Sequence, residues 1–364
     1  MYRILYVVSG AMVLGGTETM IMNYYRHIDR SKIQIDFVCY GNKEGAYDFE
    51  IISLGGKIFR LPSKKENLFK NLVGLYSICK RNNYKIIHAH MDAMNYFPLL
   101  VAKLAGVPIR ICHCHSTFHL FKNKFHFYFK ELLRKKVIKI ATEYCACAKA
   151  AGDWFYDGNS YTLIRNAIDV KRFLHNSDVE ASIRKQFHVN GKTVIGHVGN
   201  FNHPKNQIYL VQIFKEYIEI NKDAVLVLIG DGPDRQKIEQ EIKRNNLENF
   251  VLLMGNRANV NEIIQMFDIF ILVSFFEGLP VVLIEAQAAG IPCLVSDTVT
   301  REARITNLVT FLSISDAPSL WAKTISSMVK TKKSDQSQAI TQAGYNIEVE
   351  AEKLQIYYDL KIRE

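Results

Sequence analysis

The chain has 364 residues, of which 48% are hydrophobic and 23% charged, and its formal net charge is +10. These values are typical of a globular protein with two domains, and they exclude a fibrous or disordered chain. No apolar run approaches the roughly 20 residues that cross a bilayer, and the N-terminal segment predicts a strand and not a signal peptide. The positive charge favours anionic partners, but no segment resembles a nucleic-acid-binding module, so we expect no nucleic acid. We therefore expect a cytoplasmic protein that could bind to the inner face of the cell membrane.

Strands and helices are predicted to alternate along the first half of the chain. The expected strands are 2–8, 35–40, 57–60, 86–90 and 110–115, and the helices between them include 17–27, 67–82 and 95–105. Alternation of this kind indicates a parallel sheet with helices on both faces. We therefore assign residues 1–170 to a Rossmann-like domain.

The second half of the chain repeats this pattern. Its expected strands are 192–199, 224–230, 251–254, 269–273 and 292–296, with helices from about 207 and over 234–245, 260–267 and 281–289. They predict a second doubly wound domain over 171–346, entered through a polar linker at about 169–190. Residues 347–364 are expected to form an amphipathic helix that packs back towards the first domain. The predicted fold class is α/β, with two Rossmann-like domains facing each other across a cleft, where ligands commonly bind.

Two glutamates lie at the start of one of these helices. The strand 269–273 ends just before Glu277, and Pro280 can open the helix that carries Glu285. In an open α/β sheet, ligands bind at the carboxyl ends of the strands. Two carboxylates beside a helix N-terminus could therefore hold hydroxyl groups on either side of a phosphate, which the helix N-terminus itself favours.

Three loops contain glycine. In the loop before residue 17, Gly15 and Gly16 could let the backbone approach an anion, although an ordinary tight turn explains them equally well. In the loop 199–206, Lys205 could neutralise a diphosphate or simply be solvated. The turn 230–233, Gly-Asp-Gly-Pro, is interpreted as mainly structural.

Cysteines stand at every second position in two short segments, 112–115 and 145–147, and the first segment also contains two histidines. The seven cysteines are an odd number in a large chain, which is typical of reduced thiols. Their C-x-C spacing predicts buried strand residues, and we expect no metal site. The histidine pairs also alternate, so both members of a pair can face one side of the sheet; packed or loop histidines are the expected interpretation for His88, His90, His113 and His115.

Together these segments resemble the GT-B glycosyltransferases, in particular the large retaining family four, glycosyl transferases group 1, which uses nucleotide-sugar donors. The resemblance covers nearly the whole chain. It rests on two glutamates separated by seven residues and followed by Ala-Gln-Ala-Ala-Gly-Ile-Pro at 286–292. The segments 145–151, 166–169 and 230–233 are also similar to the family.

The resemblance implies roles for individual residues around the donor. Glu285 would bind the ribose hydroxyls, Glu277 a hydroxyl of the transferred sugar, and Lys205 the charge on the leaving diphosphate. The amides of Gly278, Leu279 and Val281 would face the same diphosphate. The remaining implied contacts are Gly16 with the phosphates, His115 with the donor sugar and Arg257 with the base.

Two positions depart from the family pattern. Asn200 replaces an arginine that often binds the diphosphate, so Lys205 acts alone or another arginine compensates. Pro280 replaces a residue that has an amide, and proline suits the first helical turn but donates no hydrogen bond. Both departures concern phosphate binding and not the class of protein.

The activity that the resemblance implies is transfer of a sugar from a nucleotide donor, a UDP-hexose or UDP-N-acetylhexosamine, to a polysaccharide or lipid-linked sugar acceptor. The anomeric configuration would be retained without a covalent intermediate. Because no D-x-D motif stands in a metal-binding context, we expect neither a metal nor another cofactor. The alternatives are a GT-B epimerase or phosphorylase, and a catalytically silent protein that binds nucleotide sugars or lipid.

The segment 118–136 combines aromatic residues at helical spacing with lysines and one arginine. The apolar positions are Phe118, Phe121, Phe125, Phe129 and Leu132, and the basic ones are Lys122, Lys124, Lys130, Arg134, Lys135 and Lys136. A basic, aromatic amphipathic helix can lie on an anionic membrane. The alternative is a helix whose apolar side faces the core and whose basic side is solvated.

Overall fold

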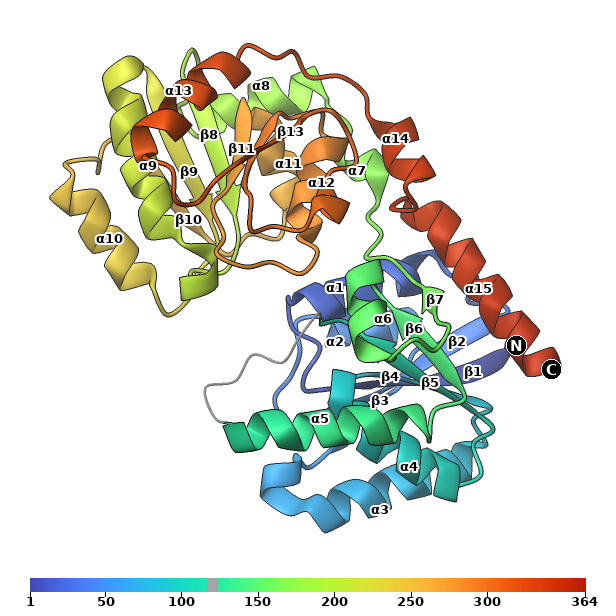
Figure 1. Ribbon diagram of the computed structural model, residues 1–364. Coiled ribbons are helices and arrows are strands. Elements are labelled where there is room, and N and C mark those ends of the chain that lie inside the picture. Colours follow the sequence, from blue (N-terminus) through green and yellow to red (C-terminus); the bar gives the residue numbers. More distant parts are fainter. Residues whose placement is uncertain (117–123) are drawn as a thin grey trace. The chain divides into compact units, whose positions relative to one another are not determined.

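The computed structural model describes residues 1–116 and 124–364, which divide into two compact units (Figure 1). Unit 1 comprises Met1–Ala167 together with Ile347–Glu364, and unit 2 comprises Ile168–Asn346. The domain boundaries expected from the sequence, at 170 and 346, lie within three residues of these divisions.

Unit 1 is built on a seven-stranded sheet in which every adjacent pair is parallel. Its strands are β1 (Tyr2–Val8), β2 (Ile33–Tyr40), β3 (Ile58–Leu61), β4 (Ile86–His90), β5 (Ile109–Cys114), β6 (Glu143–Ala146) and β7 (Thr162–Leu163). Its α-helices are α1 (Gly16–His27), α2 (Asp48–Ser53), α3 (Lys64–Asn82), α4 (Tyr96–Leu104), α5 (Lys124–Ile138), α6 (Lys149–Phe155) and α15 (Ile347–Arg363), with a 3-10 turn, η1, at Asp92–Asn95.

The last helix of the chain, α15, is part of the core of unit 1. Ala351, Leu354 and Tyr358 are buried in the same apolar cluster as residues of α1 and β1. The Tyr358 hydroxyl also lies 2.7 Å from Nδ1 of His88 in β4. Burial of these side chains holds the end of the chain on the unit in which the chain begins.

Unit 2 has a six-stranded sheet that is also parallel throughout. Its strands are β8 (Thr193–Val198), β9 (Ala224–Ile229), β10 (Val251–Gly255), β11 (Ile269–Leu272), β12 (Cys293–Ser296) and β13 (Val309–Leu312). Its α-helices are α7 (Val170–Phe173), α8 (Ser177–Gln186), α9 (Gln207–Ile220), α10 (Arg235–Arg244), α11 (Val260–Ile263), α12 (Val281–Ala288), α13 (Pro318–Met328) and α14 (Ser337–Gln342). Three 3-10 turns are η2 (His203–Lys205), η3 (Ile264–Met266) and η4 (Arg301–Ala303).

Both sheets have the strand order of a doubly wound fold. The order is β3-β2-β1-β4-β5-β6-β7 in unit 1 and β10-β9-β8-β11-β12-β13 in unit 2. The direction of winding reverses between β1 and β4 in the first sheet and between β8 and β11 in the second. In open α/β sheets, ligands bind outside the carboxyl ends of the strands at such a reversal.

The polar stretch 169–190 is not a linker, contrary to the expectation from sequence. It forms α7 and α8, and Val170, Phe173 and Ile183 are buried in the core of unit 2. The stretch is also tied to the sheet, because the Arg184 guanidinium pairs with Asp268 at 2.7 Å. A few apolar side chains at helical spacing were enough to bury one face of each helix, although the composition of the stretch is mainly polar.

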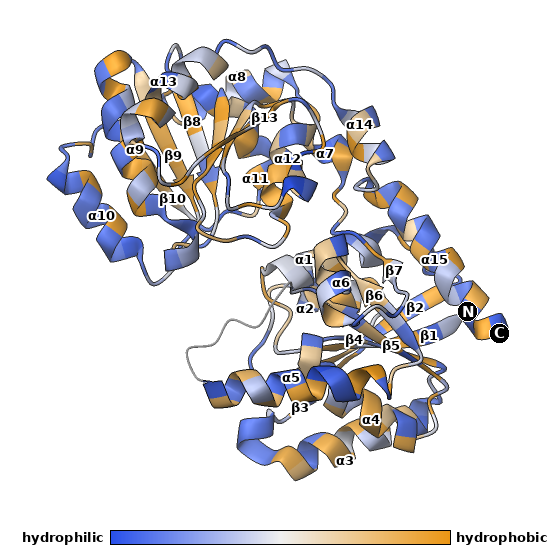
Figure 2. Cartoon of the chain, viewed as in Figure 1, coloured by the Kyte–Doolittle hydropathy of each residue, from blue (hydrophilic) through white to orange (hydrophobic). Residues whose placement is uncertain are grey.

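The hydropathy of the elements explains how each unit is layered. Figure 2 shows mostly hydrophobic strands in both units, whereas many helices carry hydrophobic and hydrophilic residues side by side. In β9, for example, all six residues are buried. Strands that are covered on both faces need this continuous apolar sequence. Within the described part of the chain, none of the helices has both the length and the apolar character that a bilayer-crossing segment requires.

Candidate functional site

Lys205 and Glu277 form an ion pair at the switch point of unit 2. Lys205 ends η2, in the loop that follows β8, and Glu277 lies in the loop that follows β11. The Lys205 ammonium pairs with Oε1 of Glu277, and the Ser274 hydroxyl donates a hydrogen bond to the same oxygen at 2.8 Å. The two charged side chains are only 18% and 13% exposed. Partial burial strengthens their attraction over that of a surface pair.

Hydrogen bonds fix the two loops to each other. The Phe275 amide donates to the Pro204 carbonyl at 2.8 Å, and Nδ2 of Asn206 donates to the Val273 carbonyl at 3.3 Å. The Ser274 carbonyl accepts from two further hydroxyls, those of Ser296 and Thr298, each at 2.6 Å. Sequence reasoning missed Ser274, although its place between the end of β11 and Glu277 was a signal.

The helix that follows Glu277 begins without a side-chain cap. Its N-cap is Pro280, which makes no side-chain cap hydrogen bond. A Cβ built on Gly278 would meet no atom within 4 Å, and its φ is not positive, so the fold itself does not require glycine there. An uncapped helix start beside an open glycine is suited to an anion that approaches the backbone closely. Leu279 packs against the apolar core and fixes this turn.

Glu285 lies in α12, partly buried, behind this turn. Desolvation raises the pKa of its carboxyl to about 7, and the charge of Arg172 opposes that rise. Arg172 is in α7, where its guanidinium donates to Oδ1 of Asn261 at 3.1 Å. Sequence reasoning missed Arg172, because the segment that contains it was interpreted as a linker. The structure therefore places a cation near the predicted ribose-binding carboxylate.

The other two donor residues predicted in unit 2 are held by their own loops. The Asn200 carbonyl accepts from Nε2 of Gln207 at 2.9 Å, and Nε of Arg257 donates to the Met254 carbonyl at 2.9 Å. Both residues are exposed. Among the residues predicted in this unit, Lys205 and Glu277 therefore contact each other. Asn200 and Arg257 instead make hydrogen bonds within their own loops.

Gly16 and His115 belong to unit 1. Gly16 is the first residue of α1, and a Cβ there would meet no atom within 4 Å. His115 directly follows β5; its amide donates to Oδ1 of Asp92 at 2.7 Å, and its Nε2 lies 3.0 Å from Nδ1 of His90. Desolvation lowers the pKa of the His115 imidazole, against the charge of Asp92.

The alternating histidines and cysteines are buried on the sheet of unit 1, as the strand pattern predicts. All seven cysteines of the chain are buried. His88 and His113 are at most 1% exposed, and His90 is 5% exposed. Burial lowers the pKa of each of these three imidazoles well below its usual value. They are therefore neutral at physiological pH.

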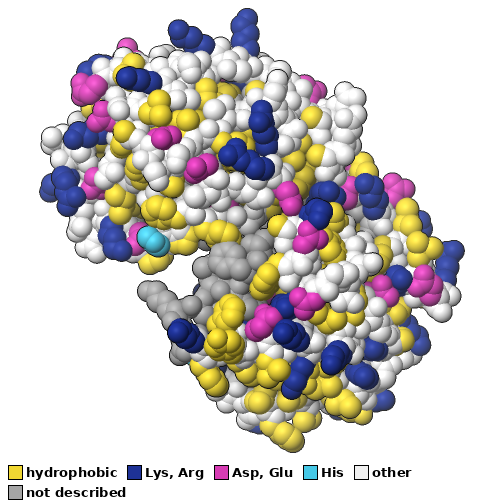
Figure 3. Space-filling model, viewed as in Figure 1, with side chains coloured by type: hydrophobic (Ala, Val, Ile, Leu, Met, Phe, Trp, Pro, Cys, Tyr) yellow, Lys and Arg dark blue, Asp and Glu magenta, His cyan; other side chains and the backbone are white. Residues whose placement is uncertain are grey.

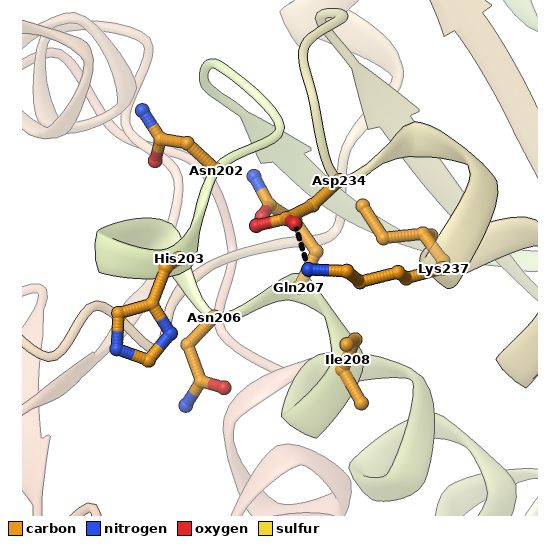
Figure 4. A pocket seen from close by; sticks show the side chains of 8 residues that line it. Asn202, His203, Asn206, Gln207, Ile208, Asp234 and Lys237 are labelled. Carbon is orange, nitrogen blue, oxygen red and sulfur yellow. Dashed lines mark hydrogen bonds and ion pairs between the residues drawn. The ribbon is translucent and has the colours of Figure 1, made fainter.

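A small cavity lies on another side of the loop that carries Lys205. It is lined by residues from this loop and from the starts of α9 and α10: Asn202, His203, Asn206, Gln207, Ile208, Asp234, Lys237 and Ile238. Figure 4 shows the ion pair between Lys237 and Asp234, which measures 2.6 Å. The cavity does not include Lys205, Glu277 or Glu285. It is thus separate from the carboxylate site.

Two family models match the chain, one in each half. The model described as Glycosyl transferases group 1 matches residues 178–346, and the model described as Glycosyltransferase Family 4 matches residues 14–172. The chain is 38% identical over 363 residues to the putative glycosyltransferase EpsF of Bacillus subtilis, covering 94% of this chain and 93% of that protein. It is 25% identical to a UDP-Gal:alpha-D-GlcNAc-diphosphoundecaprenol alpha-1,3-galactosyltransferase of Escherichia coli, covering 78% and 77% of the two chains.

The crystal structure of HepE (Alr3699) from Anabaena, in complex with UDP, has the same fold. It superposes with a TM-score of 0.80 at 16% identity and covers 99% of this chain and all of that one. The architecture is therefore that of a GT-B glycosyltransferase, as predicted. The chain belongs to the family of glycosyl transferases group 1, and it is a glycosyltransferase enzyme.

Proposed function

We propose that this enzyme transfers a hexose or N-acetylhexosamine from a UDP-linked donor to a polysaccharide or lipid-linked sugar acceptor, in the synthesis of a cell-surface glycan. The observation that carries the proposal is the Lys205–Glu277 ion pair beside the uncapped start of α12. Two comparisons support the donor and acceptor: the Anabaena structure holds UDP, and the Escherichia coli relative is named for a UDP-sugar donor and a lipid-diphosphate acceptor.

In the proposed donor site, charged side chains and backbone amides bind different parts of the nucleotide sugar. Glu285 accepts hydrogen bonds from the ribose hydroxyls, and Glu277 accepts one from a hydroxyl of the transferred sugar. Lys205 turns from Glu277 towards the diphosphate when the donor binds. The amides of Gly278, Leu279 and Val281 face the diphosphate, because an anion at a helix N-terminus is stabilised by the helix dipole. The outer contacts of the donor within unit 2 are assigned to Asn200 and Arg257.

The proposed reaction retains the configuration at the anomeric carbon. The bond from this carbon to the diphosphate oxygen breaks, and a bond from the same carbon to the acceptor oxygen forms on the same face. The acceptor proton passes to an oxygen of the departing UDP, so no side chain has to act as a nucleophile. Lys205 stabilises the negative charge that develops on the leaving group. Transfer proceeds without a divalent cation on the diphosphate, and we expect no loss of activity when Mg²⁺ and Mn²⁺ are omitted.

We further propose that the enzyme is cytoplasmic and binds the inner face of the cell membrane through α5. Phe125 is 73% exposed, Tyr128 67% and Leu132 50%, so this side of the helix is not buried in the core. Lys124, Lys135 and Lys136 are exposed beside them. Figure 3 shows hydrophobic and basic side chains together over the part of unit 1 that contains α5. A bilayer with anionic lipid would cover both kinds of side chain.

Two outcomes limit the predicted membrane segment 118–136: some of its residues are not described by the structure, and one has a structural role. Phe118, Phe121 and Lys122 lie outside the described residues. Arg134 is not on the solvated basic side, which corrects the prediction: it is buried and pairs with Glu131 at 2.6 Å and with Asp157 at 3.1 Å. A buried guanidinium needs such partners, so Arg134 is a structural residue of unit 1.

The proposed function is tested by a donor screen followed by a transfer assay. UDP, GDP and ADP, free and sugar-linked, are compared for the rise in unfolding temperature that each produces. The UDP compounds are expected to stabilise the protein most, because a ligand that binds only the native state raises its stability. The stabilising donor, radiolabelled in its sugar, is then incubated with a lipid-linked sugar extract. No UDP-dependent stabilisation and no labelled glycan product would refute the proposal.

A further inference from the structure

The histidines of β4 and β5, together with His115 just after β5, form a cluster on one face of the sheet in unit 1. His88 and His90 alternate along β4, and His113 and His115 alternate at the end of β5. Neighbouring rings along each strand stack with centroids 4.3 Å apart, and the cross-strand rings of His90 and His113 are 5.0 Å apart. Adjacent parallel strands therefore bring four imidazoles into a single cluster.

Three of these rings place a possible ligand atom close to the other two. One ring nitrogen from each of His88, His90 and His113 lies within 4.8 Å of the others. Nε2 of His88 is 3.1 Å from Nδ1 of His113, a separation that a shared proton now explains. A tetrahedral zinc ion with Zn–N bonds of about 2.0 Å places its nitrogens roughly 3.3 Å apart, which is close to the separation of this pair.

Two nitrogens in the cluster have no hydrogen-bond partner among the described residues. They are Nε2 of His90 and Nε2 of His113, and both are inaccessible to solvent. A buried polar atom without a partner costs free energy, and most buried polar atoms in proteins are satisfied. A cation that replaced the proton between His88 and His113 would also give Nε2 of His90 a partner.

The outer partners of the rings resemble those of metal-bound histidines. Nδ1 of His88 lies 2.7 Å from the Tyr358 hydroxyl, and Nδ1 of His90 lies 3.0 Å from Nε2 of His115. The second nitrogen of a metal-bound histidine usually makes such a bond, which fixes the ring. Asp92 supplies a carboxylate next to this shell, since it accepts from the His115 amide at 2.7 Å.

The cysteines that alternate with these histidines do not take part. Nδ2 of Asn95 donates to Sγ of Cys112 at 3.3 Å, and Sγ of Cys114 donates to the Ser116 carbonyl at 3.1 Å. Both sulfur atoms therefore already have hydrogen-bond partners outside the histidine cluster. The available donors are therefore neutral imidazoles, which select zinc, copper or nickel over magnesium or calcium.

We propose that His88, His90 and His113 bind one zinc-type transition-metal cation inside unit 1. This cation would lie among buried imidazoles and not on the donor diphosphate. It would join β4 to β5 and, through Tyr358, connect the metal-bound ring to α15. The proposal does not depend on the reaction assigned above, because its test measures bound metal and not sugar transfer.

The experiment uses the full chain, freed of metal by dialysis against a chelator and then titrated with Zn²⁺ and with Co²⁺. We expect one zinc per chain to remain bound through gel filtration and the unfolding temperature to rise. Cobalt should give the visible ligand-field bands of a nitrogen-ligated, four-coordinate ion, without the ultraviolet charge-transfer band of a thiolate. A wild-type protein that retains no zinc, and whose unfolding temperature zinc does not change, would overturn the proposal.

Variants then identify the ligands. His113→Gln and His90→Gln should each weaken zinc binding by about tenfold or more, whereas Cys112→Ser and the loop variant His203→Gln should bind zinc as the wild type does. Circular dichroism checks that each variant is folded. If His113→Gln fails to fold, zinc binding by His90→Gln and the cobalt spectrum of the wild type still show whether histidines are the ligands. Zinc binding that both histidine variants retain unchanged, or a thiolate band with cobalt, would contradict the assignment.

Discussion

Lys205 and Glu277 come from loops after two different strands, and they meet as an ion pair where the winding of the unit 2 sheet reverses. Ser274 donates to the same Glu277 oxygen at 2.8 Å, so this carboxylate is held in one orientation. The arrangement presents a cation and an acceptor oxygen together beside a helix start. The predictions below test what this arrangement does.

Replacing Glu277 by Gln should lower kcat for transfer by about a hundredfold, with a small effect on UDP affinity. The amide has the shape of the carboxylate but lacks its charge, so it is a weaker acceptor for the sugar hydroxyl. UDP alone lacks the sugar that Glu277 would contact. Steady-state kinetics and calorimetry with UDP measure the two effects. The matched control is Glu239→Gln, on the surface of α10, where the side chain pairs with Arg235 at 2.8 Å. If kcat of Glu277→Gln equals that of the control, the role is wrong.

Replacing Lys205 by Met should weaken UDP binding by about 10- to 100-fold, because a charge-assisted hydrogen bond to the diphosphate is lost. Calorimetric titration with UDP measures the change. Lys237→Met is the control, since Lys237 is a nearby lysine whose partner is Asp234. Undiminished UDP affinity in Lys205→Met would place the diphosphate elsewhere.

The affinity for UDP should rise with pH between about 6 and 8. Desolvation raises the pKa of Glu285 to about 7, so the carboxylate, which is the better acceptor for ribose hydroxyls, is formed only through this range. Calorimetric titrations at pH 6, 7 and 8 measure the trend. Glu285→Gln should bind UDP more weakly at pH 8 and lose this component of the pH dependence. The same slope in the wild type and in Glu285→Gln would assign the dependence to another group.

Glu285 should also make the ligand-free protein less stable as the pH rises. Its folded pKa is above that of the unfolded chain, so the native state binds more protons between about pH 4.5 and 7 and loses stability through that window. Glu285→Gln removes this cost, and its unfolding temperature at pH 8 without nucleotide should exceed that of the wild type. Calorimetric scans at pH 5 and pH 8 measure the difference, which should be smaller at pH 5. An unfolding temperature at pH 8 that is unchanged or lower would contradict the desolvation argument.

The surface of α5 should bind vesicles that contain anionic phosphatidylglycerol, and binding should fall with salt. Replacing Lys124, Lys135 and Lys136 by Gln should reduce the fraction that floats with the vesicles. The control changes three exposed lysines of unit 2, Lys215, Lys222 and Lys243, in the same way. Equal flotation of the two triple variants, or no flotation of the wild type at low salt, would show that α5 is not the membrane-binding surface.

The sequence predicted the fold class well because the buried strands are continuous apolar runs. It failed where apolar residues are sparse: α7 and α8 bury only Val170, Phe173 and Ile183, and their polar residues suggested a linker. Motif spacing located Glu277 and Glu285, and strand alternation placed the histidines on one face. Spacing could not bring Lys205 to Glu277, because that pair depends on the order of strands in the sheet. It could not bring Arg172 towards Glu285, because the segment that forms α7 was interpreted as a linker.

The most direct test of the account is a double-mutant cycle on Lys205 and Glu277, measured as kcat/KM for sugar transfer. If both residues act in one donor site, kcat/KM of the double variant Lys205→Met/Glu277→Gln should be only slightly lower than that of the less active single variant. Losses in kcat/KM that multiply as independent effects, or wild-type transfer by either single variant, would contradict the claim that this ion pair forms the donor site.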